Sequence, residues 1–249
     1  SLAALGYPVI GVRLCGHGTS PWDLRDRSWQ DWLDSVRRGY EIISAFSGKV
    51  CLIGFSTGGA LALMLAAEKP EKLAGVAAVS VPVKFRNKNL RFVSVLHGIN
   101  KLAEWASSLE GIIPFRPNES EHPNINYRHI PVRGLYELRL LIDKMTKRLA
   151  DVICPVAVIQ GTEDKIIDPK SAYTIIEEVA SKDTSLHMIP SNRHGILNED
   201  IAGTQELVTS FVMSLSKDDF VASGKENVFR DRQKQSIEKP VEMPEPGAF

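Results

Sequence analysis

The sequence predicts an α/β fold in which a mainly parallel sheet carries helices on both faces. Short apolar runs of strand length alternate with segments of helical periodicity, which is typical of parallel strands joined by crossover helices. The chain has 249 residues and 43% hydrophobic content, enough to bury a sizeable core. Chains of this size commonly form one α/β domain, so we expect one core with an insertion.

Most of the predicted strands are short apolar runs that end in a polar or glycine-rich turn, and residues 184–190 instead alternate as a strand does. One predicted helix opens at Ser28 and continues to about Phe46, because Trp32, Val36 and Tyr40 recur at helical spacing. A second predicted helix includes residues 60–67. The predicted strands are residues 9–14, 49–53, 73–80, 155–160 and 184–190.

The alternation stops near residue 81 and resumes near residue 151. We interpret residues 81–150 as a cap insertion over the carboxyl ends of the strands, where parallel sheets place their sites, and residues 1–80 with 151–217 as the core. Residues 218–249 are rich in polar and charged side chains, which predicts a disordered tail. Apolar cap residues either line an acyl pocket or pack the cap onto the core: Phe85, Phe92, Leu96, Trp105, Ile112, Ile113 and Phe115.

The segment 54–59 reads Gly-Phe-Ser-Thr-Gly-Gly and places Ser56 at the centre of a G-x-S-x-G pattern between a strand and a helix. A sharp turn of this kind needs glycine on both sides of the serine, because strand and helix meet where no Cβ fits. The turn exposes the hydroxyl above the sheet edge, so Ser56 is the predicted nucleophile. The alternative is a glycine-rich turn with no chemistry.

Two further residues complete the order nucleophile, acid, base that accompanies this elbow. Asp164 follows the strand 155–160 in a polar turn, and His194 lies in the loop after the strand 184–190. We predict Asp164 as the acid and His194 as the base. Glu163 and Asp168 are the rival carboxylates.

Four segments of the chain resemble the α/β-hydrolase superfamily, and within it the small-cap carboxylesterases and monoacylglycerol lipases. The segments are residues 13–21, 54–59, 161–169 and 192–195. The resemblance implies the α/β-hydrolase fold and a triad whose acid is the first Asp of a G-x-x-D-x-x-[VI]-x-P loop, which matches Asp164 and leaves Asp168 as a helix N-cap.

The same resemblance implies how the site works. Ser56 attacks an ester, His194 takes its proton, and the backbone N–H of Thr57, where relatives often carry Met, stabilises the oxyanion. A second oxyanion donor is expected in a His-Gly loop upstream of this chain. The resemblance also places a strand between residues 9–14 and 50–53, so we expect the chain to be truncated at its amino end, with a gap in its sheet.

Composition excludes several partner classes. Lys+Arg and Asp+Glu are balanced at 30 each, so no net field favours nucleic acid or an anionic membrane surface. No apolar run approaches the roughly 20 residues of a membrane span. We expect a small, largely uncharged ester substrate. Three cysteines, an odd number placed near buried strands, favour a reducing, cytoplasmic location; a catalytic role for Cys15 is disfavoured because Ser56 holds the elbow.

Neither a metal nor a cofactor is predicted. The chain has no G-x-G-x-x-G pattern and no P-loop, and no histidine has the spacing to Cys or carboxylates that metal sites show. The histidines outside the triad are read as structural or rim residues: His17, His97, His122, His129 and His187. The expected activity is therefore a serine esterase. The alternatives are a hydrolase of peptide, amide or thioester bonds and a non-catalytic scaffold; the sequence does not fix the oligomeric state.

Overall fold

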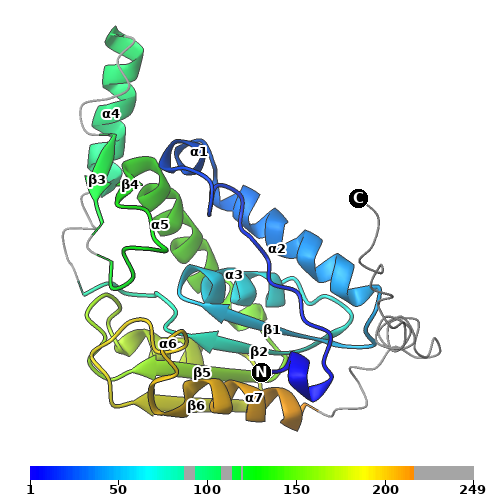
Figure 1. Cartoon of the computed structure of the whole chain (residues 1–249). Helices are drawn as coiled ribbons and strands as arrows, with labels where there is room; N and C mark the ends of the chain where they lie inside the picture. Colours follow the sequence, from blue (N-terminus) through cyan, green and yellow to red (C-terminus); the bar gives the residue numbers. More distant parts are fainter. Residues whose placement is uncertain (87–92, 108–113, 119, 216–249) are drawn as a thin grey trace, which may run out of the picture.

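The computed structural model describes residues 1–86, 93–107, 114–118 and 120–215, with the backbone alone for 102–107. At its centre four parallel strands pair in the order β1-β2-β5-β6 (Figure 1). The strands are β1 (Val50–Phe55), β2 (Leu73–Val79), β5 (Val156–Gly161) and β6 (Thr184–Ile189). The α/β prediction is confirmed, and four of the five predicted strands form.

Helices cover both faces of this sheet. Along β2, Val76 and Ala78 pack into one hydrophobic cluster while Ala77 and Val79 pack into another, because successive strand residues point to opposite faces. The first cluster contains residues of α2 (Trp29–Ser44), α3 (Thr57–Ala66), α5 (Val132–Thr146) and α6 (Lys170–Glu178). The second contains Val208 of α7 (Thr204–Ser214).

Helix α3 is apolar around its whole circumference because it is buried on all sides. Residues 60–66 are at most 5% exposed, and the helix packs against β1, β2, α2 and α5. Its amino end therefore lies fixed beneath the carboxyl edge of the sheet. Helix α2 starts at a capping box, in which the Ser28 hydroxyl accepts from the Asp31 N–H and the Asp31 carboxylate accepts from the Ser28 N–H.

The predicted strand at residues 9–14 is not a strand. The segment runs extended, but it has no ladder partner among the described residues, and Val9 is 57% exposed. Paired strands lie about 4.8 Å apart. Residues 9–14 and β1 instead line the same cavity, which lies between them. Val12 packs instead against Gly39 of α2, where a Cβ would overlap it. The strand expected between 9–14 and β1 stays a prediction.

The insertion contributes α4 (Val93–Ser107), the antiparallel pair β3 (Phe115–Pro117) and β4 (His129–Pro131), and α5. Helix α4 extends away from the sheet in Figure 1. Helix α5 buries Leu141 and Met145 in the main core, while the cap boundaries stay a prediction. Of the apolar cap residues, Phe92, Ile112, Ile113 and the side chain of Trp105 lie outside the described part, as do residues 218–249.

Short elements complete the fold. They are η1 (Ala3–Leu5), α1 (Pro21–Arg25), η3 (Leu149–Asp151) and η4 (Ile201–Gly203). The Ser20 hydroxyl accepts from the Asp23 N–H to begin α1. Helix α1 lies close to β4 and α5, so the loop after residue 16 meets the insertion.

Candidate active site

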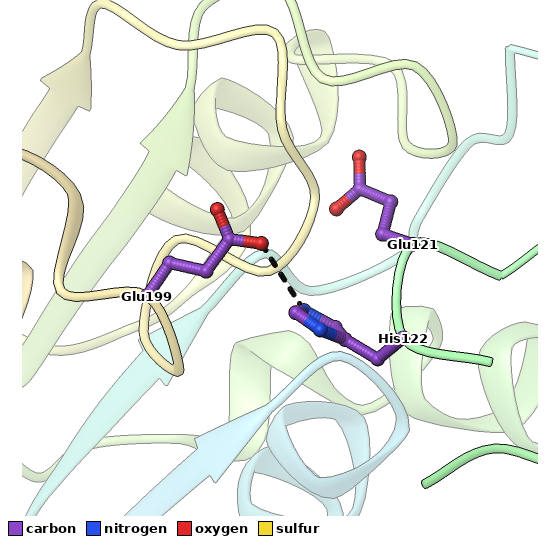
Figure 2. Close-up of side chains that lie close together, drawn as sticks. All are labelled: Glu121, His122 and Glu199. Carbon is purple, nitrogen blue, oxygen red and sulfur yellow. Dashed lines mark ion pairs between the residues drawn. The ribbon is translucent and has the colours of Figure 1, made fainter. Parts of the chain in front are cut away.

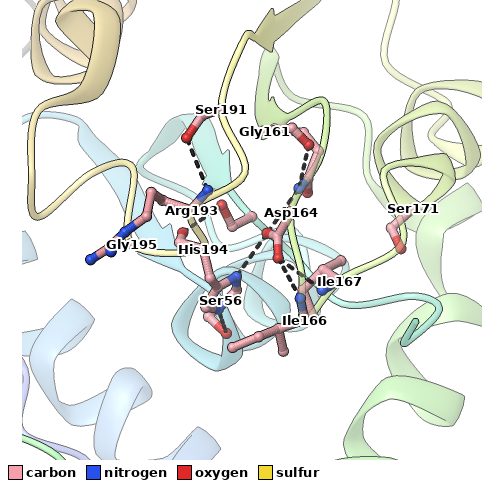
Figure 3. Close-up of polar contacts among 12 residues, drawn as sticks. Ser56, Gly161, Asp164, Ile166, Ile167, Ser171, Ser191, Arg193, His194 and Gly195 are labelled. Atoms are coloured by element: carbon pink, nitrogen blue, oxygen red, sulfur yellow. Dashed lines mark hydrogen bonds and ion pairs between the residues drawn. The ribbon is translucent and has the colours of Figure 1, made fainter. Parts of the chain in front are cut away.

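The site lies at the carboxyl edge of the sheet. Ser56 follows β1, Asp164 follows β5, and His194 lies in the loop after β6, so three loops converge because the strands are parallel and in register (Figure 3). The structure therefore brings together the three residues predicted as nucleophile, acid and base. Their polar atoms form one chain: Ser56 Oγ lies 3.0 Å from His194 Nε2, and His194 Nδ1 lies 2.8 Å from Asp164 Oδ2.

Ser56 has a strained backbone, with φ 52° and ψ −119°. A non-glycine residue in this region costs about 1–3 kcal/mol and persists only where its surroundings hold it. The Ser56 N–H donates to the Val79 carbonyl at 2.8 Å, and the Ser56 carbonyl accepts from Gly59 and Ala60 at the start of α3. The turn is thus fixed on both sides, with the hydroxyl held toward His194.

The steric need for glycine falls on Gly54, as the pattern suggests, and on Gly59 in place of Gly58. A Cβ on Gly54 would overlap the backbone of Gly58, and one on Gly59 would overlap a methyl group of Val81. A Cβ on Gly58 would meet nothing within 4 Å. The prediction that both pattern glycines are required by close contact is therefore wrong for Gly58, which lines the cavity.

Asp164 is fully buried and uses both carboxylate oxygens. Oδ1 accepts from the N–H groups of Ile166 and Ile167 at 2.8 and 3.0 Å, and Oδ2 accepts from Gln160 Nε2 at 3.1 Å beside His194. Burial by itself raises the carboxyl pKa, but the hydrogen bond to His194, its charge and the two N–H groups outweigh burial, so the pKa is lowered. Asp164 therefore carries a negative charge beside the imidazole.

The rival carboxylates have other positions. Glu163 is exposed, and its N–H donates to the Ser191 carbonyl. Asp168 lies just before α6, whose N-cap is Pro169 and not Asp168 as expected, and its carboxylate accepts from the Lys170 N–H at 3.0 Å.

Three contacts at this site have little sequence signal. Gln160 is a buried amide within an apolar strand, and a buried polar side chain of this kind needs a hydrogen-bond partner, which here is Asp164. The ring of Phe55 lies 5.0 Å from that of His194. Glu121 accepts from the backbone N–H of His194, although 73 residues separate the two.

The Thr57 N–H is the first of helix α3, where backbone donors have no intrahelical partner and the helix dipole is positive. The oxyanion role of the Thr57 N–H stays a prediction. The second oxyanion donor stays a prediction. Nearby, His17 packs edge-on against Trp32, with ring centroids 5.6 Å apart. Burial lowers the pKa of His17 despite a hydrogen bond to the Cys15 carbonyl, which acts to raise it.

A cavity of about 1000 Å³ opens over Ser56 and His194 and continues along β1. Its lining includes Phe85, one of the predicted pocket residues, together with Ile166 and Tyr127. Phe115 instead packs its ring on Trp22 at 4.5 Å. The cavity thus offers an apolar volume next to the serine hydroxyl.

Beside the His194 loop, Glu121, His122 and Glu199 place one ligand atom each within 4.8 Å of one another (Figure 2). Carboxylates and imidazole are ligands that Zn²⁺ accepts. The guanidinium of Arg193, however, pairs with Glu199 and lies 3.6 Å from Glu121 Oε2. In the part of the chain that the structure describes, a cation of the protein itself already balances these carboxylates.

The comparisons with known proteins agree with this geometry. Residues 1–201 match the Hydrolase_4 family, described as serine aminopeptidase, S33. The chain is an α/β-hydrolase of this family. This α/β-hydrolase is 26% identical over 196 residues to the thermostable monoacylglycerol lipase of Bacillus sp. (strain H-257), which covers 77% of this chain and 73% of that protein. It is 24% identical to a carboxylesterase of Bacillus subtilis (strain 168), over 77% of this chain and 74% of the relative.

Solved structures show the same fold. A metagenome-derived lipolytic enzyme, from a study of LipS and LipT, aligns with a TM-score of 0.67 at 20% identity, over 81% of this α/β-hydrolase and 78% of that chain. A soluble variant of the Saccharomyces cerevisiae monoglyceride lipase aligns with a TM-score of 0.62 at 15% identity, over 82% and 75%. Within the described residues, no helix combines the length and apolar character needed to cross a membrane.

Proposed function

We propose that this chain is a serine hydrolase that cleaves carboxylic esters of small or medium acyl groups through an acyl-enzyme on Ser56. The observation that carries the proposal is the hydrogen-bonded chain from Ser56 through His194 to the buried Asp164. The names of the relatives, a monoacylglycerol lipase and a carboxylesterase, support an ester as the substrate class.

In the acylation step, Ser56 Oγ attacks the ester carbonyl while His194 Nε2 takes its proton. An unassisted hydroxyl is a poor nucleophile at neutral pH, so this transfer is needed. Asp164 holds the tautomer with a proton on Nδ1 and stabilises the imidazolium. The Thr57 N–H stabilises the oxyanion, a contact whose loss costs on the order of 100- to 1000-fold in rate. The imidazolium then protonates the departing alcohol.

In the deacylation step, His194 takes a proton from water, and the resulting hydroxide attacks the acyl carbon. The C–O bond to Ser56 breaks, the serine recovers its proton from His194, and the carboxylic acid leaves. The proton that Ser56 lost to the departing alcohol is replaced by one from water, so the free enzyme is restored, the cycle consumes one water, and it requires neither a metal nor a cofactor. Residues 81–150 act in this proposal as a cap that covers the acyl chain and excludes bulk water.

One observation favours a second activity. The family is described as serine aminopeptidase, and the same triad cleaves amides. A panel that contains both p-nitrophenyl esters, from acetate to palmitate, and aminoacyl p-nitroanilides separates the two. Ester hydrolysis at least 100-fold above anilide hydrolysis supports the esterase, and the reverse ratio supports the peptidase.

The decisive control is Ser56→Ala, with Ser214→Ala on the exposed face of α7 as the matched substitution. Ser56→Ala abolishes both hydrolysis and covalent labelling by a fluorophosphonate, whereas Ser214→Ala preserves both. Failure of the wild-type protein to label or to hydrolyse any substrate in the panel favours a non-catalytic scaffold.

The cysteines support a reducing compartment, such as the cytoplasm, in this proposal. Cys15, Cys51 and Cys154 are free thiols. Burial raises the pKa of Cys51 to about 12 and that of Cys154 to about 11, so both remain protonated and behave as small apolar side chains.

A further inference from the structure

Residues 120–128, here called the strap, connect β3 to β4 and bind the core on both sides of the site. The Tyr127 hydroxyl donates to the Gly16 carbonyl at 3.0 Å and accepts from the Thr19 N–H at 2.7 Å. Near the other end, Glu121 binds the loop that carries His194. The cavity that contains Ser56 is lined by residues of the strap between these two attachments.

The strap has a defined conformation of its own. The Ser120 hydroxyl accepts from the His122 N–H at 3.0 Å and from Asn126 Nδ2 at 2.6 Å, and the His122 carbonyl accepts from the N–H groups of Ile125 and Asn126. These bonds close a turn directly after Glu121. The Glu121 carboxylate is therefore presented to the core from a short, internally bonded loop.

One oxygen of Glu121 receives two backbone donors. Oε2 accepts from the His194 N–H at 3.0 Å and from the Gly195 N–H at 3.1 Å, and the Glu121 side chain is only 18% exposed. Hydrogen bonds to an ionised acceptor are roughly twice as strong as neutral ones. This contact ties the insertion directly to the residue whose imidazole faces Ser56.

The remaining polar atoms of His194 are bound by the core. Its carbonyl accepts from the Ser80 hydroxyl and the Ile196 N–H, and its ring nitrogens face Asp164 and Ser56. The N–H is thus the polar group of His194 that the insertion binds. A shift of this backbone turns the imidazole away from Ser56, because the ring is attached through a single Cβ.

We propose that Glu121 is a positioning residue for the reaction, which acts by fixing the backbone of His194 and Gly195. The proposal rests on the hydrolase function proposed above. In it, the insertion does not only cover the substrate: it supplies part of the support that aims the general base.

Close packing at Gly195 supports this role independently. A Cβ at Gly195 would lie 2.7 Å from His122 Nε2, at the end of a side chain of the strap, so that ring would have to move, and 3.6 Å from Glu121 Oε2, which is ordinary contact. The φ of Gly195 lies outside the left-handed range. Glycine is needed there for the contact with the strap and not for the backbone conformation.

The ion pairs around Glu121 hold the same loop. Arg193, next to His194, pairs with Glu199, and His122 of the strap lies 3.2 Å from the same Glu199 carboxylate (Figure 2). The Arg193 guanidinium therefore lies between the carboxylates of Glu199, on its own loop, and of Glu121, on the strap, which favours contact between the two segments.

The experiment uses the full chain and two kinds of substitution at the contact. Glu121→Ala removes the acceptor, and Glu121→Gln keeps a neutral one. Gly195→Ala keeps both N–H groups and the Glu121 contact but displaces the His122 ring. The matched controls are Glu177→Gln on the exposed face of α6 and Gly98→Ala on α4, where a Cβ would meet nothing within 4 Å.

We expect kcat to fall between about 10- and 100-fold in Glu121→Ala, since a displacement near 1 Å in a reacting group costs about this much. Glu121→Gln should recover most of the loss, and Gly195→Ala, which moves the His122 ring but keeps the Glu121 acceptor, should cost less than Glu121→Ala. KM should change less than about threefold. The same fold-loss should appear for acetate, butyrate and octanoate esters and in the rate of fluorophosphonate labelling at Ser56.

Hydrogen–deuterium exchange of the peptide that contains His194 and Gly195 gives a readout independent of activity. It should accelerate in Glu121→Ala and not in Glu177→Gln. Unchanged exchange, or faster exchange with unchanged kcat and labelling, overturns the proposal. So does a loss confined to long acyl chains, which indicates that Glu121 only shapes the pocket. If the wild-type protein neither labels nor hydrolyses esters, the proposed function has failed, and Glu121 then has no reaction to serve.

Discussion

Replacement of Asp164 by Asn tests the chemistry at the atom where the structure is most constrained. The Oδ1 position accepts two backbone N–H groups, from Ile166 and Ile167, so the Asn carbonyl oxygen must take that place. The Asn amide NH₂ then faces Gln160 Nε2 and His194 Nδ1, both of which donate to the carboxylate in the native protein. The Asn NH₂ can only donate, so His194 must turn an unprotonated Nδ1 toward it to accept the hydrogen bond.

That tautomer places the proton on Nε2, which faces Ser56 Oγ and can no longer accept its proton. Loss of the correct tautomer in a Ser-His-Asp triad lowers kcat by about 10,000-fold. At 1.36 kcal/mol for each factor of ten, this is about 5 kcal/mol of transition-state stabilisation. The side-chain volume hardly changes, so the fold should persist.

Steady-state hydrolysis of p-nitrophenyl butyrate measures the loss, with circular dichroism and a urea midpoint as checks on folding. Asp168→Asn is the matched control: it removes a charge just before the amino end of α6 and should cost less than about 1 kcal/mol of stability, with kcat unchanged. A loss below tenfold in folded Asp164→Asn, or an equal loss in Asp168→Asn, refutes the assignment of Asp164 as the residue that orients His194.

Three further predictions concern the elbow and pH. Ser56→Gly relieves the positive φ, so its free energy of unfolding should exceed that of Ser56→Ala by about 1–2 kcal/mol. Its urea midpoint should be correspondingly higher, and both variants should be inactive; equal midpoints refute the strain. Gly54→Ala should lose activity and expression because its Cβ overlaps Gly58, whereas Gly58→Ala should remain folded, as thermal melts will show. The pKa of His17 is lowered from its ordinary value of 6.5, so the unfolded chain binds the proton first as pH drops, and stability should fall below pH 6.5. Urea denaturation from pH 8 to 5.5 measures this, and the free energy of unfolding should depend less on pH in His17→Gln.

The sheet and the elbow were predictable because their signals are local. The runs that became β1, β2 and β5 are mainly apolar over their own length, and the β6 segment alternates polar and apolar residues, so each strand could be predicted without information from elsewhere. The segment 9–14 has the same kind of pattern and forms no ladder, because pairing also requires a neighbour and the described residues supply none beside it.

Contacts between distant segments were not predictable. Glu121 is one of 30 acidic residues, and its binding to His194 spans 73 positions of chain with no periodicity to mark it. The difference between Gly58 and Gly59 is equally hidden, since it depends on where Val81 enters from the next connection. Ser56, Asp164 and His194 were predictable because each follows a strand in a fixed chain order, whereas no such order marks Glu121.

Some glycines of the elbow have no room for a side chain and others do, and this difference determines which substitutions the protein can tolerate during evolution. Gly54 and Gly59 admit no side chain, so almost any substitution there is selected against before its chemistry is expressed. Gly58 faces the cavity with open space around it and lies two residues from the serine. Substitutions at Gly58 can therefore change the shape of the cavity while the turn that presents the hydroxyl stays intact.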